Sequence, residues 1–267
     1  MKQFLGTILI CSFALVLSGQ QLITPGENYY DDNKGIVYNK EFSVLARFHT
    51  HGFSMGVNMG TLKTYYLTRF LNFEIGELKH GKEFKQSRDL QPISNQVSRA
   101  YIFGKQNNLY ALRAGFGEKR YLSEKAKRRG LAVGISYEVG PVLGLLKPYY
   151  LELVRNQENG DPVFIIQSEK YGPENEDLFL DFTRIYGSSG FSKGLGELSV
   201  VPGAQAKFAM HFDWGAFDEF VKAVEAGVMM DFFFQEPQVM IETEGSGVNN
   251  SPLFLNLYIN LQFGKRW

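Results

Sequence analysis

The last fifteen residues of the chain alternate between apolar and polar positions. Large apolar side chains occupy every second position from Leu253 to Phe263. The alternate positions from Asn256 to Gly264 carry polar residues or glycine. Successive side chains of a β-strand point to opposite faces, so this segment predicts a strand with one apolar and one polar face. The chain then ends on Trp267, and the whole pattern is typical of the closing strand of an outer-membrane β-barrel.

Segments with the same period of two recur along the chain, and a tilted transmembrane strand needs about 9 to 11 residues of this kind. We expect about ten such strands. They are 42–50, 53–60, 65–78, 100–104, 109–121, 131–138, 142–154, 204–214, 217–234 and 253–263. The segments 131–138 and 142–154 could also form one long strand with a bulge at Gly140 and Pro141, although two strands are favoured.

These segments predict an all-β fold, a transmembrane antiparallel up-and-down β-barrel with long extracellular loops. The expected number of strands is about 8 to 12, with ten favoured. A β-sandwich in solution or at a surface would use similar alternation, but several segments exceed ten residues, which favours the barrel. Residues 217–226 also have apolar side chains at helical spacing, so one helical turn before a strand stays open there.

The first residues predict export from the cytoplasm. Met1 and Lys2 precede an apolar run from Phe4 to Leu17, which is the pattern of a secretory signal peptide. The run is shorter than the roughly 20 apolar residues that a membrane helix needs. We therefore expect a signal peptide at 1–20, a periplasmic segment at 21–40 and an outer-membrane barrel at 41–267, which includes a long loop at 155–201.

Composition agrees with a barrel and narrows the chemistry. Cys11, the single cysteine, lies in the signal peptide, so a mature chain has no thiol for a disulfide, a metal or a nucleophile. Apolar residues make up 44% and aromatic residues 15% of the chain, and Phe232, Phe233 and Phe234 are expected in an aromatic girdle at the membrane interface. The formal net charge of zero argues against a nucleic-acid partner.

Four pieces of the chain resemble uncharacterised outer-membrane β-barrel proteins of the Bacteroidota. They are YIFGKQNN at 101–108, GFG at 115–117 followed by Lys119 and Arg120, GPVLGLLKPYYL at 140–151, and FGKRW at 263–267. The resemblance implies the barrel fold and the outer membrane as its location. It implies no defined activity; an accessory role in an outer-membrane assembly or secretion complex is compatible with it, and none of these residues selects that role.

A basic cluster is expected on a loop between two strands. If strands are counted from a periplasmic N-terminus, this loop lies outside the cell, where lipopolysaccharide presents phosphate groups that bind Lys and Arg strongly. The alternative is a solvated loop, partly neutralised by Glu118 and Glu124. The candidates for lipopolysaccharide contact are Lys119, Arg120, Lys125, Lys127, Arg128 and Arg129.

Charged residues within the predicted strands are candidates to line the barrel interior. Inward charges suit the transport of a small solute, but in a small barrel they can instead form ion pairs that fill the lumen. The candidates are Arg47, Arg69, Glu74, Arg113 and Glu152.

Three further clusters are weighed and set aside. His49 and His51 share one strand face and suit Zn²⁺ or Cu²⁺, but they lack an evident third ligand, so no metal site is expected. His51 and Ser54 would suit a lipid A deacylase, yet an acyl hydrolase also needs an orienting carboxylate. The acidic residues of the long loop lack the spacing of a Ca²⁺ loop; they are Glu174, Glu176, Asp177 and Asp181.

The long loop at 155–201 favours a structural or partner-binding function without catalysis, in which the barrel holds this loop or docks against an outer-membrane assembly or secretion complex. The expected partners are outer-membrane lipid, lipopolysaccharide and such a complex. A narrow channel or transporter for small solutes is the alternative, and a lipid A-modifying enzyme is the third class. We expect no enzyme activity, catalytic residue or cofactor.

Overall fold

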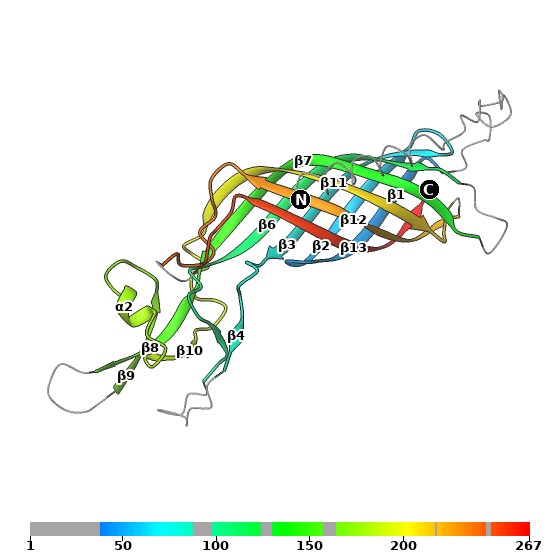
Figure 1. The fold of residues 1–267 in the computed structure, drawn as a ribbon. Coiled ribbons are helices and arrows are strands. Elements are labelled where there is room, and N and C mark those ends of the chain that lie inside the picture. Colours follow the sequence, from blue (N-terminus) through cyan, green and yellow to red (C-terminus); the bar gives the residue numbers. More distant parts are fainter. Residues whose placement is uncertain (1–37, 88–97, 124–129, 157–163, 217, 244–246) are drawn as a thin grey trace, which may run out of the picture. The chain divides into compact units, whose positions relative to one another are not determined.

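The computed structural model describes residues 38–87, 98–123, 130–156, 164–216, 218–243 and 247–267, so the expected signal peptide lies outside the described residues. Eight strands form one closed antiparallel barrel (Figure 1). They are β1 (Lys40–His49), β2 (Gly52–Leu62), β3 (Leu67–Leu78), β6 (Asn107–Tyr121), β7 (Ala132–Pro148), β11 (Ser199–Asp213), β12 (Phe220–Phe233) and β13 (Leu253–Arg266).

The barrel closes between its first and last strands. β1 pairs with β13 in a register that runs from Glu41 opposite Arg266 to His49 opposite Tyr258. Each of the other pairs joins two barrel strands that are consecutive along the chain, so the order is β1-β13-β12-β11-β7-β6-β3-β2. Every barrel strand therefore has two hydrogen-bonded neighbours, and the up-and-down barrel predicted from the alternation is confirmed.

Eight strands lie within the expected range, but the favoured number of ten is wrong, for two reasons. Residues 100–104 contain only the short strand β5 (Tyr101–Ile102), which pairs with β4 (Lys85–Gln86) outside the barrel. Gly140 and Pro141 do not end a strand, because β7 continues through them. Proline cannot donate a backbone hydrogen bond, so the pairing of β7 with β6 lapses there while the pairing with β11 continues.

The helical alternative at residues 217–226 is also wrong. β12 begins at Phe220, and its buried and exposed positions alternate as in a strand. The residues of this segment that are described before it, Asp218 and Glu219, form a bend. The alternating pattern therefore overrides the helical spacing once the segment pairs with β11 and β13 on its two sides.

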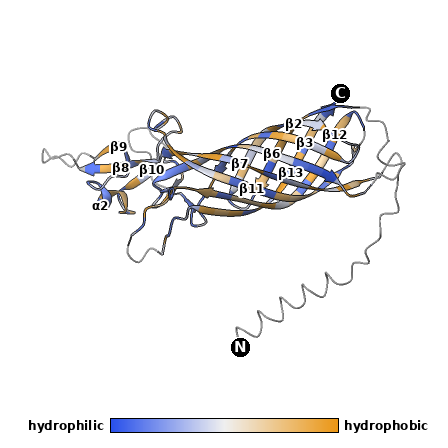
Figure 2. Cartoon of the chain, turned by 90° about the horizontal axis from the view of Figure 1, so that it is seen from above, coloured by the Kyte–Doolittle hydropathy of each residue, from blue (hydrophilic) through white to orange (hydrophobic). Residues whose placement is uncertain are grey.

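The two faces of the barrel wall differ in polarity, and Figure 2 shows hydrophilic and hydrophobic residues following one another along the strands. Outward positions carry large apolar side chains that stay highly exposed, among them Phe48 (60%), Val139 (60%), Leu255 (65%) and Leu257 (64%). Inward positions on the same strands carry polar and charged side chains. This arrangement is the reverse of a soluble protein and is that of an outer-membrane-type barrel.

The connections divide between the two ends of the barrel. Lys40 and Arg266 lie at one end, here called the terminal end, with the connections 63–66, 122–131 and 214–219. The opposite end, here called the loop end, has the short turn at 50–51 and three long connections, 79–106, 149–198 and 234–252. Long and short connections thus lie largely at opposite ends, as the sequence predicted.

The longest connection at the loop end is folded. It contains β8 (Tyr150–Asn156), β9 (Phe164–Lys170), the short helix α2 (Glu176–Phe179) and β10 (Ile185–Ser188). Its three strands pair in the order β10-β8-β9, and we call them the loop-end sheet. A hydrophobic cluster covers this sheet; its fully or almost fully buried members are Tyr101, Leu151, Leu153, Phe179, Ile185 and Ile241. Within the described part of the chain, no helix is long and apolar enough to cross a membrane.

Replacing residues 149–198 with a short turn of about four residues should leave the barrel folded. β7 and β11 pair directly up to Leu146 opposite Ser199, so a hairpin turn can join them without a change of register. The measurement is the heat-dependent shift of the folded band in gel electrophoresis, together with the β-sheet circular dichroism signal. Loss of the folded band would mean that the barrel depends on the loop-end sheet.

Candidate functional site

Ion pairs fill the middle of the barrel interior. The Glu74 carboxylate accepts hydrogen bonds from three cations on three different strands: Arg47, Arg113 at 2.9 Å and Lys207 at 2.9 Å. Arg113 also donates two bonds, at 2.8 and 2.9 Å, to the Asp231 carboxylate. The Arg47 guanidinium lies 4.6 Å from the centre of the Tyr258 ring. All six residues are at least nine-tenths buried.

A second network lies at the terminal end of the interior. Arg266 of β13 donates to Glu41 of β1 and to Asp213 of β11, both at 2.8 Å. Lys119 of β6 donates to Glu41 at 2.8 Å, and the Tyr121 hydroxyl donates to Asp213 at 2.7 Å. Four strands that are not all neighbours are therefore joined across the lumen.

Amides and a histidine complete the interior. Glu138 accepts from Asn72 at 2.9 Å, from Gln205 at 2.8 Å and from Lys207 at 3.0 Å. A Cβ at Gly115 would lie 2.1 Å from the Glu138 carboxylate, so glycine makes room for it. His211 lies 2.9 Å from the Glu225 carboxylate. The interior cations are Arg47, Arg113, Lys119, Lys207 and Arg266, and the interior carboxylates are Glu41, Glu74, Glu138, Asp213, Glu225 and Asp231.

Little free volume remains among these groups. The cavity between Arg47, Glu138, Lys207 and their neighbours measures about 10 Å³, which is roughly the space of one water. Passage of a solute through this interior would require the ion pairs to separate. The described interior is therefore packed in the way that small eight-stranded barrels allow.

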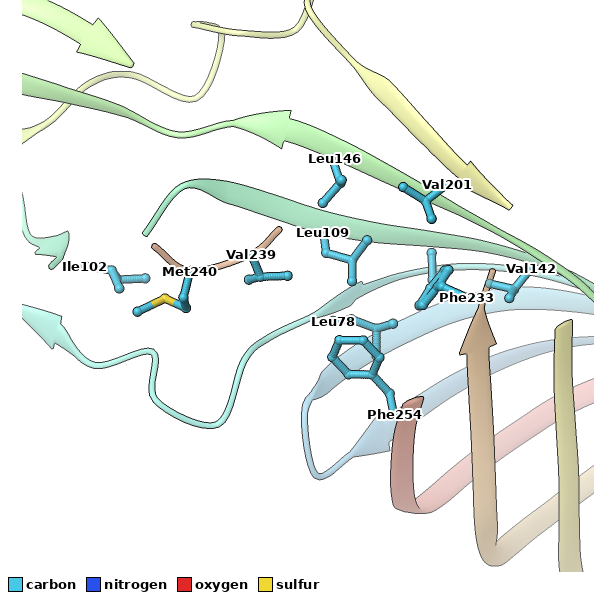
Figure 3. Packing of buried hydrophobic residues seen from close by; sticks show 11 residues of the cluster. Leu78, Ile102, Leu109, Val142, Leu146, Val201, Phe233, Val239, Met240 and Phe254 are labelled. Carbon is cyan, nitrogen blue, oxygen red and sulfur yellow. The ribbon is translucent and has the colours of Figure 1, made fainter. Parts of the chain in front are cut away.

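Apolar side chains close the interior at the loop end (Figure 3). Val239 and Met240, from the connection between β12 and β13, pack against Leu109 and the other residues of this cluster. Asn250 fixes this connection: its Oδ1 accepts from the backbone N–H of Val239 and Met240 at 3.1 Å each, and its Nδ2 donates to the Met240 carbonyl at 2.9 Å. The cluster also contains Leu78, Ile102, Ala111, Val142, Leu146, Val201, Phe233 and Phe254.

A large groove lies at the loop end on the outside of the barrel. It measures about 920 Å³ and is lined by outward residues of β2, β3, β6 and β7 and by parts of the long connections. Phe53, Met55 and Ile75 supply apolar surface. The charged residues that line it are Glu77, Lys79, Glu83, Lys85, Lys105, Lys147 and Lys193.

The structure brings three of the five predicted lumen-lining residues together. Arg47, Glu74 and Arg113 face the interior and form the network described above. The prediction is wrong for Arg69, which lies on the outer face with its side chain 50% exposed and donates to Glu118 at 2.8 Å. It is also wrong for Glu152, because β8 belongs to the loop-end sheet and not to the barrel.

The predicted lipopolysaccharide cluster does not form as expected. Lys119 points into the barrel and pairs with Glu41, because it shares the inward parity of Arg113 on β6. Arg120 lies on the outer face and is exposed. The connection that follows β6 leaves the barrel at the terminal end, with both described chain ends, which reverses the predicted side. Four candidates lie outside the described residues: Lys125, Lys127, Arg128 and Arg129.

The structure does not bring the histidine and serine candidates together on one face of the barrel wall. His49 and Ser54 lie in the interior, with exposed fractions of 9% and 1%. His51 lies in the turn, where its Nδ1 is 2.6 Å from the Asn256 side-chain oxygen. A lipid enzyme would need His51 and Ser54 to face the membrane together, and the buried Ser54 does not. The described residues contain no group of three or more His, Cys, Asp or Glu that could hold a metal ion.

Three residues of the acidic cluster have local roles within the long connection. Asp181 accepts from the Thr183 backbone N–H at 2.8 Å and lies 3.9 Å from Arg184. Glu176 and Asp177 occupy the first turn of α2, where carboxylates are favourable. This cluster is a surface feature of the long connection.

Comparisons with known proteins add little to this picture. No protein family and no curated protein matches the chain. Among solved structures, the N-terminal β-barrel domain of Pseudomonas aeruginosa OprF matches over 86% of this chain and 98% of that chain, with 9% identity and a TM-score of 0.33. The barrel is therefore assigned from the strand pairing of this chain alone.

Replacing Glu74 with glutamine should destabilise the barrel strongly. The change leaves Arg47, Arg113 and Lys207 with one carboxylate fewer in a buried site, and breaking a buried ion pair costs about 3–5 kcal/mol. The measurement is urea unfolding of the purified protein in lipid vesicles. Arg69→Gln is the matched control, because it removes an exposed pair of little energetic value. Equal effects of the two substitutions would contradict a structural role for the interior network.

Proposed function

We propose that the chain is an integral outer-membrane protein whose barrel anchors the loop-end sheet, so that this sheet binds a protein partner in the outer membrane. The single observation that carries the proposal is the contrast between a barrel interior filled by ion pairs and a long connection that folds into a sheet with its own hydrophobic cluster. A filled barrel serves as an anchor, and a folded connection has a defined surface.

Membrane insertion is supported by the outer face. Its exposed residues include aromatic and aliphatic side chains on all eight strands, a surface that water would disfavour. The closed sheet also leaves no unpaired edge in contact with lipid. The barrel strands have 10 to 17 residues, enough to cross the hydrocarbon layer when tilted.

Partner binding is supported by the edge strand of the loop-end sheet. β9 pairs with β8 on one side, and no described strand pairs with its other side. Exposed edge strands are ready templates for a strand from another chain. Arg155 donates two hydrogen bonds to Glu169, at 2.5 and 2.8 Å, which braces the hairpin of β8 and β9. The same bonds lower the pKa of Glu169, so this pair is formed at neutral pH.

The two competing classes receive less support. A transporter would have to separate the ion pairs of Glu74 and move the apolar cluster at the loop end. A lipid A-modifying enzyme would need a different nucleophile, because Ser54 faces the interior. A structural or partner-binding role requires neither change, and within it the accessory-subunit hypothesis stays a proposal.

Cysteine accessibility should establish the orientation of the barrel. We expect a membrane-impermeant maleimide to label Gly81→Cys and Ser192→Cys, both at the loop end, on intact cells. Thr64→Cys, in an exposed turn at the terminal end, should be labelled only after the outer membrane is permeabilised. The only natural cysteine is Cys11, so the mature chain gives no background. Labelling of Thr64→Cys on intact cells would show the opposite orientation, with the terminal end outside the cell.

Purification from native membranes in mild detergent should recover a stoichiometric partner with the tagged full-length protein. The variant in which a short turn replaces residues 149–198 should lose this partner while it retains a folded barrel. Ile165→Lys is the finer test, because it places a charge at an exposed position of the edge strand (45% exposed) and leaves the sheet intact. Recovery of the full-length barrel alone, by mass spectrometry, would contradict the proposal.

A further inference from the structure

Lys147 occupies an unusual place on the outside of the barrel. It follows Leu143 and Leu145 in the outward row of β7, the row whose other members form apolar surface. Its side chain is nevertheless only 4% exposed, because the long connection covers it and places the Phe191 ring 4.3 Å from the ammonium group. A cation therefore lies buried at the upper limit of the apolar surface, within the groove of about 920 Å³.

This cation has no carboxylate partner in the part of the chain that the structure describes. Among the described residues Lys147 forms no ion pair or hydrogen bond, whereas Lys105 beside it pairs with Glu83 at 2.5 Å. Burial of an unpaired charge is costly, so the position favours an anionic partner. The buried Ser189 hydroxyl, also in the groove wall, has no hydrogen-bond partner either among the described residues.

The groove as a whole carries a positive charge. Five lysines and two glutamates line it, which gives a formal net charge of 5 − 2 = +3. Lys79 lies 3.4 Å from Glu77 and Lys105 pairs with Glu83, so within the described residues the cations without a carboxylate partner are Lys85, Lys147 and Lys193. Lys85 and Lys193 come from the connections at the loop end and are exposed.

Part of the groove is apolar and continues the outer face of the barrel. Phe53, Met55 and Ile75 line it and are 47%, 58% and 55% exposed. These residues lie on β2 and β3 in the same outward rows as the remaining membrane-facing surface. The groove thus combines lysines at the loop end with apolar residues that belong to the outer face of the barrel.

We propose that this groove binds a phosphorylated lipid of the outer membrane, with its phosphate at Lys147 and its acyl chains along Phe53, Met55 and Ile75. A phosphate monoester or diester would supply the missing anion and accept a hydrogen bond from the Ser189 hydroxyl. A free anion would leave the apolar wall unused, and an uncharged lipid would leave Lys147 unpaired. The inference rests on the membrane placement proposed above and is independent of a protein partner.

The test is native mass spectrometry of the full-length protein in detergent, after incubation with defined probes. The probes are diphosphoryl lipid A, phosphatidylglycerol, an uncharged diacylglycerol and inorganic phosphate. We expect one lipid A or phosphatidylglycerol molecule to stay bound, and Lys147→Met to weaken that binding about tenfold, the value of one charge-assisted hydrogen bond. Lys147→Arg should retain it, and Lys63→Met, at the terminal end, should not change it.

Lys85→Gln combined with Lys193→Gln provides a second variant at exposed positions, in case Lys147→Met does not fold, and it should weaken binding several-fold. Unchanged lipid binding in a folded Lys147→Met variant overturns the proposal. Binding of inorganic phosphate as strong as that of the lipids, or equal binding of diacylglycerol, also overturns it. Failure of the membrane placement itself would appear separately, as absence of a heat-modifiable band from the outer-membrane fraction.

Discussion

The pairing of β1 with β13 leaves the sheet without an edge, and this closure determines what each side chain can do. A closed wall satisfies its own backbone hydrogen bonds, so its outer face can be apolar without exposing an unpaired amide. The period of two then sends every second residue inward. Because the outer face takes the large apolar side chains, the inward positions receive the charges, and these must be paired within the lumen.

The interior ion pairs consequently fill the interior and hold the strands together, as a hydrophobic core does in a soluble domain. Glu74 joins β3 to β1, β6 and β11, and Arg266 joins β13 to β1 and β11. Each carboxylate joins strands far apart in sequence, so the network fixes the shape of the wall as well as filling it. A lumen occupied in this way leaves binding to the outside of the barrel and to the connections at the loop end.

Period-two alternation was enough to predict the barrel and the inward positions of Arg47, Glu74 and Arg113, because parity within a strand is a local property. The number of barrel strands, and the end of the barrel at which each connection lies, depend on the whole chain and not on local sequence. Residues 100–104 alternate like a barrel strand, but Tyr101 and Ile102 pair with Gln86 and Lys85 in a two-stranded sheet outside the barrel. One extra strand reverses the direction of every strand that follows, which placed the connection after β6 on the wrong side. Lys119 was assigned to a loop with the basic residues that follow it, although it lies within the predicted strand 109–121, and β6 does continue to Tyr121.

Lys147 shows what alternation cannot reveal. Its parity predicts an outward residue at the end of β7, and a lysine there would ordinarily extend into water. Phe191, more than forty residues away in sequence, covers it, and only the folded connection brings the two together. The polarity of the outward row changes between Leu145 and Lys147, which marks the boundary of the apolar surface. A buried cation at that boundary, beside apolar residues, matches the division between phosphate and acyl chain in a membrane lipid. This match is the basis for placing a phosphorylated lipid in the groove.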